Sequence, residues 1–181
     1  MMLQVHSTSQ CPYPLTNLSS APMRFLSICL ITFLLTLPAV AQDAEEAAVL
    51  AAAQAIFDGI NEKNGDLITA TMMPDGILYS TTDRGGTPQA YFTSAEQFAS
   101  EVTTTERDFH ERMFETTVHI QKGIAVVWAN YDFHVNGEWS HCGVDTFSLV
   151  KTADGWRVAS LTYTVEFEDC QERPPIPSSD G

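Results

Sequence analysis

Apolar residues recur at helical spacing between residues 43 and 64, which predicts an amphipathic helix. The stripe consists of Val49, Leu50, Ala53, Ile56, Phe57 and Ile60. Two shorter helices are expected after it, one capped by Asp66 and ended by Pro74, and one opened by the capping pattern of residues 93–96. The first part of the chain is therefore predicted to be mainly helical.

From Arg107 onward the pattern changes to runs of β-branched and aromatic residues. Four such runs are separated by Lys122-Gly123, Asn136-Gly137 and Asp154-Gly155, and Asn-Gly and Asp-Gly are strong hairpin signals. Two shorter strands are expected earlier, at residues 77–82 and 89–92. Helices followed by a four-stranded antiparallel meander predict an α+β domain with the helices on one face of the sheet.

The predicted domain covers residues 42–172. Before it, Met23-Arg24, an apolar block at residues 25–37 and small residues up to Ala41 form the pattern of a secretory signal. The block is too short for a stable membrane anchor, which needs about 20 apolar residues. We expect translation to start at Met23 and cleavage to follow Ala41, so that residues 1–41 are an upstream extension plus a signal. An unusually long signal is the alternative. Prolines and serines in residues 173–181 predict a flexible tail.

The charge of the chain limits the kinds of partner that are expected, and its cysteines bear on its compartment. The formal net charge is −14, and it becomes −15 once Arg24 is removed with the signal. Such an excess repels nucleic acid and anionic membranes, so neither is expected as a partner. Cys142 and Cys170 are the cysteines that remain after cleavage. An exported, periplasmic or secreted domain is expected to join them in a disulfide, and two small buried thiols are the alternative.

The end of the domain resembles a known superfamily. Residues 141–147, the following Leu149-Val150-Lys151, the strand Gly155-Trp156-Arg157-Val158 and Thr164 resemble the last two strands of the nuclear transport factor 2-like superfamily. The helical entry with Asn64-Gly65-Asp66 is similar as well. The sub-group that this chain resembles most comprises SnoaL-like and bacterial lumazine-binding-like exported domains.

The resemblance covers nearly the whole domain and implies its architecture. It implies a cone-shaped, curved antiparallel sheet packed on N-terminal helices, as in a cystatin-like roll, with a pocket between its concave face and the helices. It also implies a homodimer formed through the sheet. The superfamily contains isomerases, dehydratases, cyclases, accessory subunits and plain binders, so the resemblance by itself implies no single activity.

The hairpin at Asn136-Gly137 permits a prediction of which side chains face the pocket. A two-residue turn there, continued along the ladder, places Asp132 opposite His141 and Trp128 opposite Asp145. The concave face is then expected to be apolar at one end and polar at the other. The apolar end would carry Val126, Phe147, Leu149 and Leu161, and the polar end His110, Arg112, Asp132, His141, Asp145 and Tyr163. Gly143 would leave room for a ligand.

These residues suggest acid–base chemistry. His141 titrates near neutrality, and a carboxylate from Asp132 or Asp145 beside it would favour its charged form, so these three are the candidate catalytic residues. Candidate ligand-binding residues are Arg112, Trp128, Tyr163, Phe147 and His110. The alternative is a structural polar network of Asp132, Arg112 and His141, with the aromatic residues in the core.

No sequence motif indicates a metal or a cofactor. The histidines lack metal-binding spacing, and motifs for a serine nucleophile, a phosphate loop or a paired CxxC are missing from the sequence. Three functions therefore stay open. The first is binding of a small apolar or aromatic molecule. The second is a cofactor-free lyase or isomerase that uses His141 with Asp132 or Asp145. The third is a dimeric interaction module without a working pocket.

Overall fold

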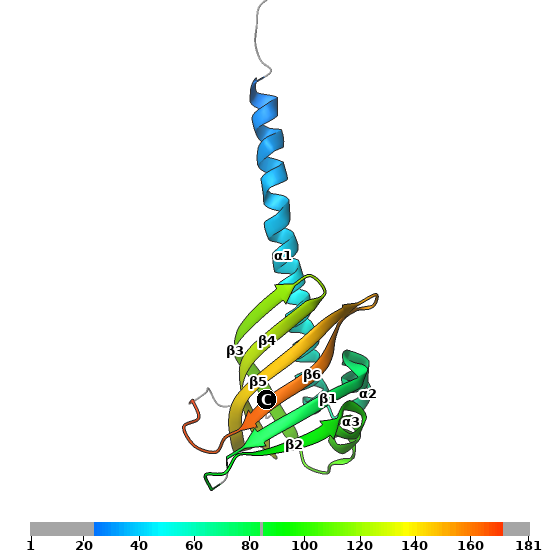
Figure 1. The fold of residues 1–181 in the computed structure, drawn as a ribbon, viewed down its shortest axis with the longest axis vertical. Coiled ribbons are helices and arrows are strands. Elements are labelled where there is room, and N and C mark those ends of the chain that lie inside the picture. Colours follow the sequence, from blue (N-terminus) through cyan, green and yellow to red (C-terminus); the bar gives the residue numbers. More distant parts are fainter. Residues whose placement is uncertain (1–23, 84, 172–181) are drawn as a thin grey trace, which may run out of the picture. The chain divides into compact units, whose positions relative to one another are not determined.

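The computed structural model describes residues 24–83 and 85–171, which form three helices and six strands (Figure 1). The helices are α1 (Arg24–Asn61), α2 (Gly65–Thr71) and α3 (Ala95–Thr104). The strands are β1 (Met72–Thr82), β2 (Gln89–Ser94), β3 (Phe109–Gln121), β4 (Ile124–Val135), β5 (Glu138–Thr152) and β6 (Gly155–Val165). The chain divides into the units Met1–Ala39 and Val40–Gly181, and the second is the domain discussed below.

Several expectations about the chain ends stay predictions. The start at Met23 and the tail at residues 173–181 lie outside the described residues. The backbone of α1 is helical through the expected cleavage site after Ala41. Within the part of the chain that the structure describes, no helix is long and apolar enough to span a membrane.

The predicted α+β fold is confirmed, with one difference in the sheet. The strand order is β2-β1-β6-β5-β4-β3, and β3 to β6 form the expected antiparallel meander. However, β1 pairs parallel to β6, so the sheet is mixed and not wholly antiparallel. A parallel pair needs a long connection, and the whole chain from β2 to β5 provides it here.

The apolar stripe of α1 packs on one face of the sheet, which we call the inner face. The ring of Phe57 on α1 lies 5.8 Å from that of Phe147 on β5, and both side chains are buried. The indole nitrogen of Trp156 on β6 donates to the Glu45 carboxylate on α1 at 2.8 Å. The second part of α1 passes behind the sheet in Figure 1, which leaves the opposite, outer face toward the viewer.

Local capping signals locate the two short helices. Ser94 accepts a hydrogen bond from the backbone of Gln97 and starts α3, as the sequence predicts. The prediction that Asp66 caps α2 is wrong, because the cap is Asn64, whose side chain accepts from the backbone of Leu67 at 3.0 Å. Asp66 lies in the first turn, where its carboxylate still interacts favourably with the positive end of the helix dipole.

The predicted disulfide is present. Cys142 on β5 is bonded to Cys170 in the segment after β6, with their Cα atoms 5.8 Å apart. A backbone pair between Cys142 and Glu166 extends the β5–β6 ladder just before this link. The disulfide therefore ties the end of the domain to the middle of the sheet.

Candidate functional site

A cavity of about 200 Å³ lies between the inner face of the sheet and the helices. Its apolar lining comes from both layers and consists of Ile60, Phe98, Val102, Phe109, Phe133, Leu161 and Val165. Its polar lining consists of Glu111, Tyr131, His141, Asp145 and Tyr163. An apolar hollow with a few converging polar groups is the usual form of a small-molecule site.

Two carboxyl groups are buried in this lining. Asp145 is 2% exposed and Glu111 is 9% exposed. The Oδ2 atom of Asp145 is buried without a hydrogen-bond partner among the described residues. Burial raises the pKa of both carboxyls well above their usual range, and the negative charge of Asp145 raises the pKa of Glu111 further. The cavity therefore favours the protonated form of these carboxyls more than solvent does.

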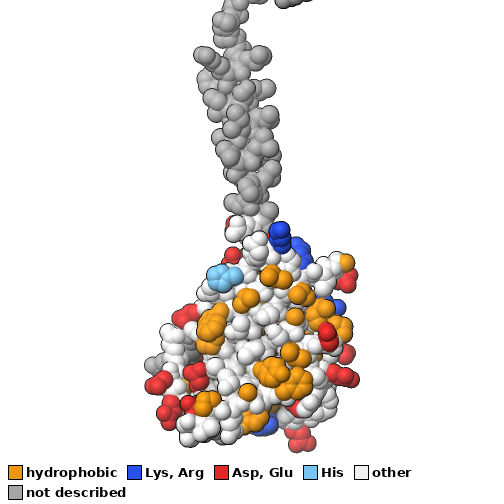
Figure 2. Space-filling model, viewed as in Figure 1, with side chains coloured by type: hydrophobic (Ala, Val, Ile, Leu, Met, Phe, Trp, Pro, Cys, Tyr) orange, Lys and Arg blue, Asp and Glu red, His pale blue; other side chains and the backbone are white. Residues whose placement is uncertain are grey.

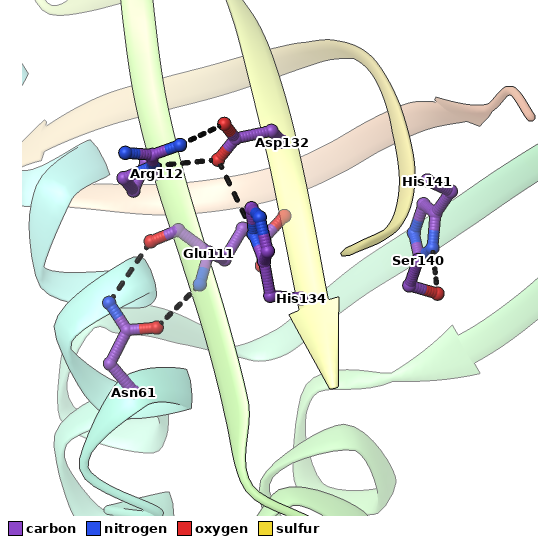
Figure 3. Close-up of polar contacts among 7 residues, drawn as sticks. All are labelled: Asn61, Glu111, Arg112, Asp132, His134, Ser140 and His141. Atoms are coloured by element: carbon purple, nitrogen blue, oxygen red, sulfur yellow. Dashed lines mark hydrogen bonds and ion pairs between the residues drawn. The ribbon is translucent and has the colours of Figure 1, made fainter. Parts of the chain in front are cut away.

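Asn61, the last residue of α1, holds β3 at Glu111. Its side-chain oxygen accepts from the Glu111 backbone nitrogen at 2.7 Å, and its side-chain nitrogen donates to the Glu111 carbonyl at 3.0 Å. Figure 3 shows these two bonds side by side at the end of the helix. The pair of bonds ties the backbone that carries the Glu111 carboxyl to the helix layer.

His141 lies among aromatic rings at one side of the cavity. Its ring stacks on Phe133 with centroids 4.8 Å apart and meets the edge of Tyr131 at 5.8 Å. Its Nδ1 atom is 3.0 Å from the hydroxyl of Ser140 (Figure 3). Phe167, from the segment that the disulfide anchors, packs beside it at 5.9 Å. The imidazole is therefore oriented by packing as well as by a polar contact.

The two tyrosines of the lining differ in their partners. The hydroxyl of Tyr131 donates to the carbonyl of Thr164 at 2.6 Å, whereas the hydroxyl of Tyr163 forms a side-chain hydrogen bond with Ser80. The two rings meet edge to face, with centroids 6.4 Å apart. Burial raises the pKa of both hydroxyls, and the nearby carboxyls raise both further. Gly143 leaves no room for a ligand, contrary to prediction. A Cβ atom there would lie 2.3 Å from the Thr164 carbonyl and 2.7 Å from the Tyr131 ring.

Three predicted site residues line the cavity: His141, Asp145 and Tyr163. Phe147 faces inward as expected, but it packs in the core against Phe57 and is not part of the lining. Leu161 is part of the lining, and Leu149 is buried in the core. The prediction was therefore accurate for β5 and β6.

The predictions for β4 and the first half of β3 are wrong. The turn pairs Val135 with Glu138 as expected, but β5 then contains one extra residue between Trp139 and His141. His141 consequently pairs with Phe133 and Asp145 with Ala129, in place of Asp132 and Trp128. This bulge puts Trp128, Val126 and Asp132 on the outer face, and Trp128 is 52% exposed.

A second bulge, between Phe114 and Thr117 of β3, has the same consequence for His110 and Arg112. Glu115 within it has a φ of 50°. Val118 and Ile120, after the bulge, pack against the core as predicted. His110, Arg112 and Phe114, before it, pair with outer-face residues of β4.

The displaced residues form a separate polar cluster on the outer side of the sheet. The Arg112 guanidinium binds the Asp132 carboxylate through two contacts, of which the Nε–Oδ1 bond is 2.9 Å (Figure 3). His134 Nδ1 lies 3.9 Å from the same Oδ1 atom, and His110 is paired across the strands with His134. Burial and the positive charge of Arg112 lower the pKa of His110. Asp132 and His141 therefore do not form a catalytic pair.

Sequence reasoning missed Glu111, Tyr131 and Phe133 as site residues. A signal for Glu111 existed, since it alternates with the apolar Phe109 and Met113 and so shares their face. No group of three or more metal-ligating side chains occurs among the residues described.

Comparisons with known proteins support the fold. No protein-family model and no curated protein matches the chain. Solved structures do match. A candidate dehydratase of the nuclear transport factor 2-like family from Streptomyces avermitilis has a TM-score of 0.54 at 14% identity, over 70% of this chain and 99% of that one. A nuclear transport factor 2-like protein from Cytophaga hutchinsonii has a TM-score of 0.56 at 10% identity, over 67% and 98%.

A third match is a protein with a cystatin-like fold from Nostoc punctiforme. Its TM-score is 0.54 at 10% identity, over 68% of this chain and 92% of that one. At these identities the likeness concerns the fold alone. The fold of this chain is that of the nuclear transport factor 2-like superfamily, as its closing strands and helical entry suggest.

Proposed function

We propose that this domain binds a small molecule in the cavity between its sheet and its helices. The observation that carries the proposal is the pair of buried carboxyls, Glu111 and Asp145, in an otherwise apolar and aromatic hollow. Burial of an unpaired polar group costs about 1–3 kcal/mol in proteins, so a purely structural core would be expected to lack such groups. A ligand that binds them would offset this cost.

The size of the cavity limits the ligand. Pockets for drug-sized molecules usually measure about 300–1,000 Å³, whereas an apolar cavity of about 150 Å³ can hold benzene. A volume of about 200 Å³ therefore fits a single ring with a small substituent, or an aliphatic molecule of similar size.

The test is a cavity-filling variant together with a search for bound ligand. Val102→Phe on α3 places a ring in the cavity, and Ser100→Phe, at an exposed position of the same helix, is the matched control. The wild-type protein should release a co-purified molecule when it is denatured, and mass spectrometry should detect this molecule. Ser100→Phe should retain the molecule, and Val102→Phe should lack it. A native protein without ligand, which also gives no thermal shift with a panel of single-ring compounds, would contradict the proposal.

Acid–base catalysis is a second candidate function, and the raised pKa values of Glu111 and Asp145 favour it. A carboxyl pair that shares one proton contains both an acid and a base, which lyase and isomerase reactions require. His141 and Asp145 remain candidates for this role, with Glu111 in place of Asp132. Once the bound molecule is known, its conversion by the native protein and not by Glu111→Gln would support this function.

We also propose that the domain acts outside the cytoplasm. The signal-like segment before Ala41 supports this proposal, and the Cys142–Cys170 disulfide is consistent with it. Mass spectrometry of the protein from an extracytoplasmic fraction should give a chain that begins at Gln42. A full-length chain found in the cytoplasm with free thiols would contradict export.

A further inference from the structure

The lining of the cavity contains more acidic than basic side chains. It has two carboxyls, Glu111 and Asp145, and no lysine or arginine of the described chain. His141 is the basic group of the lining, and its Nδ1 atom is already 3.0 Å from the Ser140 hydroxyl. The Asp145 Oδ2 atom is buried and has no hydrogen-bond partner among the described residues. A buried carboxylate without a neighbouring cation is stabilised either by taking up a proton or by binding a positively charged ligand.

The cations that lie within three residues of the cavity lining in the sequence have other partners. Arg112 directly follows Glu111, but it lies on the other face of the sheet and binds Asp132. Lys63 forms an ion pair with Asp108 at 2.9 Å. Arg107 is exposed and lies over the ring of Phe109.

Several acidic groups outside the lining also act on the residues of the cavity. Glu101 on α3 acts electrostatically on Tyr163, and Glu166, after β6, acts on Tyr131. Asp132, behind β4, acts on Glu111. The formal net charge of the whole chain is −14. Both the local and the overall field therefore attract cations and raise the rate at which they reach the site.

The aromatic part of the lining suits a cation too. Phe98, Phe109, Phe133, Tyr131 and Tyr163 all border the cavity. The faces of such rings attract ammonium groups, and this attraction grows when the site excludes water. A neutral aromatic ligand would also pack against these rings, but it would bring no positive charge to the carboxyl pair.

We infer that the ligand of this cavity is a small organic cation, an ammonium group on a single ring or on an aliphatic body of similar size. The ammonium group binds between Glu111 and Asp145, and its apolar body packs against the rings of Phe98, Phe109 and Phe133. This inference rests on the proposed small-molecule function and specifies its ligand class. When the cation binds, a proton held by the carboxyl pair is released to the solvent, so the bound state has a fully ionised pair.

The experiment uses two probes of nearly the same shape, the benzylammonium ion and benzyl alcohol, with the folded domain in isothermal titration calorimetry. Benzylammonium is expected to bind at least tenfold more tightly at pH 7.5. Its affinity should rise as the pH increases from 5 to 8, because the carboxyls lose their protons, whereas that of the alcohol should stay level or fall. Titrations in two buffers of different ionisation enthalpy should show release of up to about one proton per bound cation.

A double variant, Glu111→Gln with Asp145→Asn, tests the assignment of the carboxyls. It should lose the preference for benzylammonium and still bind benzyl alcohol. The control variant Glu62→Gln with Glu96→Gln removes two exposed charges and should retain the preference. If the double variant fails to fold, the pH series and the proton count with the native protein decide the question.

The outcomes separate the two levels of the proposal. Equal or tighter binding of benzyl alcohol, with no proton release, overturns the inference of a cationic ligand but leaves a small-molecule site. Unaltered preference for benzylammonium in the double variant also overturns it. If neither probe binds and the panel of single-ring compounds gives no thermal shift, the small-molecule function fails as well.

Discussion

Buried carboxyls on the two faces of the sheet differ in whether a lysine or arginine lies beside them. On the outer side, Asp132 is 3% exposed and is bound through two contacts by Arg112. On the inner side, Glu111 and Asp145 are buried to a similar degree in a cavity without lysine or arginine. Glu111 and Arg112 are neighbours in sequence, yet alternation along β3 places them on different faces. A buried carboxylate with its own cation indicates a structural role, and a pair of carboxyls without one indicates a ligand site.

The largest effect is expected from the disulfide, which lies next to the outer cluster because Cys142 is paired across the strands with Asp132. The double variant Cys142→Ser with Cys170→Ser should lower the free energy of unfolding by about 3–4 kcal/mol, given the separation of 28 residues. Urea denaturation of the variant and of the native protein, with and without reductant, measures it. A loss below about 1 kcal/mol would show that the end of the chain is held by other contacts.

The next effect tests the structural role of the outer pair. Arg112→Met leaves the Asp132 carboxylate buried without its cation and should cost about 2–3 kcal/mol at pH 7, with some relief because Arg112 is partly exposed. Urea denaturation measures the loss, and the double variant Arg112→Met with Asp132→Leu should recover most of it. A stability of Arg112→Met equal to that of the native protein would remove the contrast between the two faces.

A smaller loss of stability is expected at Asn61, through which α1 holds the backbone of Glu111. Asn61→Ala removes both hydrogen bonds to the Glu111 backbone and should cost about 1–2 kcal/mol. The control Gln54→Ala removes a hydrogen bond between side chains on the same helix and should cost less than about 0.5 kcal/mol. Benzylammonium affinity should fall in Asn61→Ala and not in Gln54→Ala, because only the first variant releases the backbone that carries the Glu111 carboxyl. Equal affinity in both variants would mean that Asn61 has a structural role only.

The inner carboxyls should produce a pH dependence of a defined sign. The pKa of Glu111 is raised in the folded state, so its contribution to stability is present at low pH and is lost as pH rises through the raised value. Glu111→Gln should therefore match the native protein near pH 4 and exceed its stability by about 1 kcal/mol near pH 8. Thermal denaturation across this range measures the difference, with the exposed Glu62→Gln as control. A variant less stable than the native protein at pH 8 would contradict the buried, unpaired state of Glu111.

The smallest effect on the stability of the domain is expected from a substitution on the outer face. Ile124, Val126 and Trp128 are exposed there, and Figure 2 shows hydrophobic side chains over this side of the sheet with acidic ones toward its edges. Homodimerisation through the sheet stays a prediction. Trp128→Ser should convert a dimer to monomers in sedimentation velocity with a change of stability below about 0.5 kcal/mol, whereas Glu96→Ser, at an exposed position of α3, should not. A native protein that is monomeric at high concentration would contradict the dimer.

Local signals were sufficient for most of the elements. Helical spacing located the packed stripe of α1 from Val49 to Ile60, and Gly-containing dipeptides located the three hairpins of the meander. The two cysteines of the predicted domain indicated the disulfide. Each of these patterns reflects a short-range preference of the backbone, or a count of residues, that the chain carries wherever it folds.

Face assignments were correct only in part of the sheet. His141, Asp145 and Tyr163 were expected on the inner face and lie there, because β5 and β6 keep their alternation through the site. Asp132 and Trp128 were expected beside them and lie on the outer side, because the extra residue near Ser140 shifts β5 against β4. A two-residue turn with the right pairing at Val135 was therefore not enough to predict the register beyond it.

The sequence by itself determined the kind and order of most elements and the acidic character of the domain, and it favoured a Cys142–Cys170 disulfide over two thiols. The tertiary structure alone decided that Arg112 and Asp132 pair on the outer side and that Glu111 and Asp145 border one cavity. The physical reason is that a bulge has little local signature. It depends on which packing of both faces buries more apolar surface, and so on contacts between strands and helices distant in the chain.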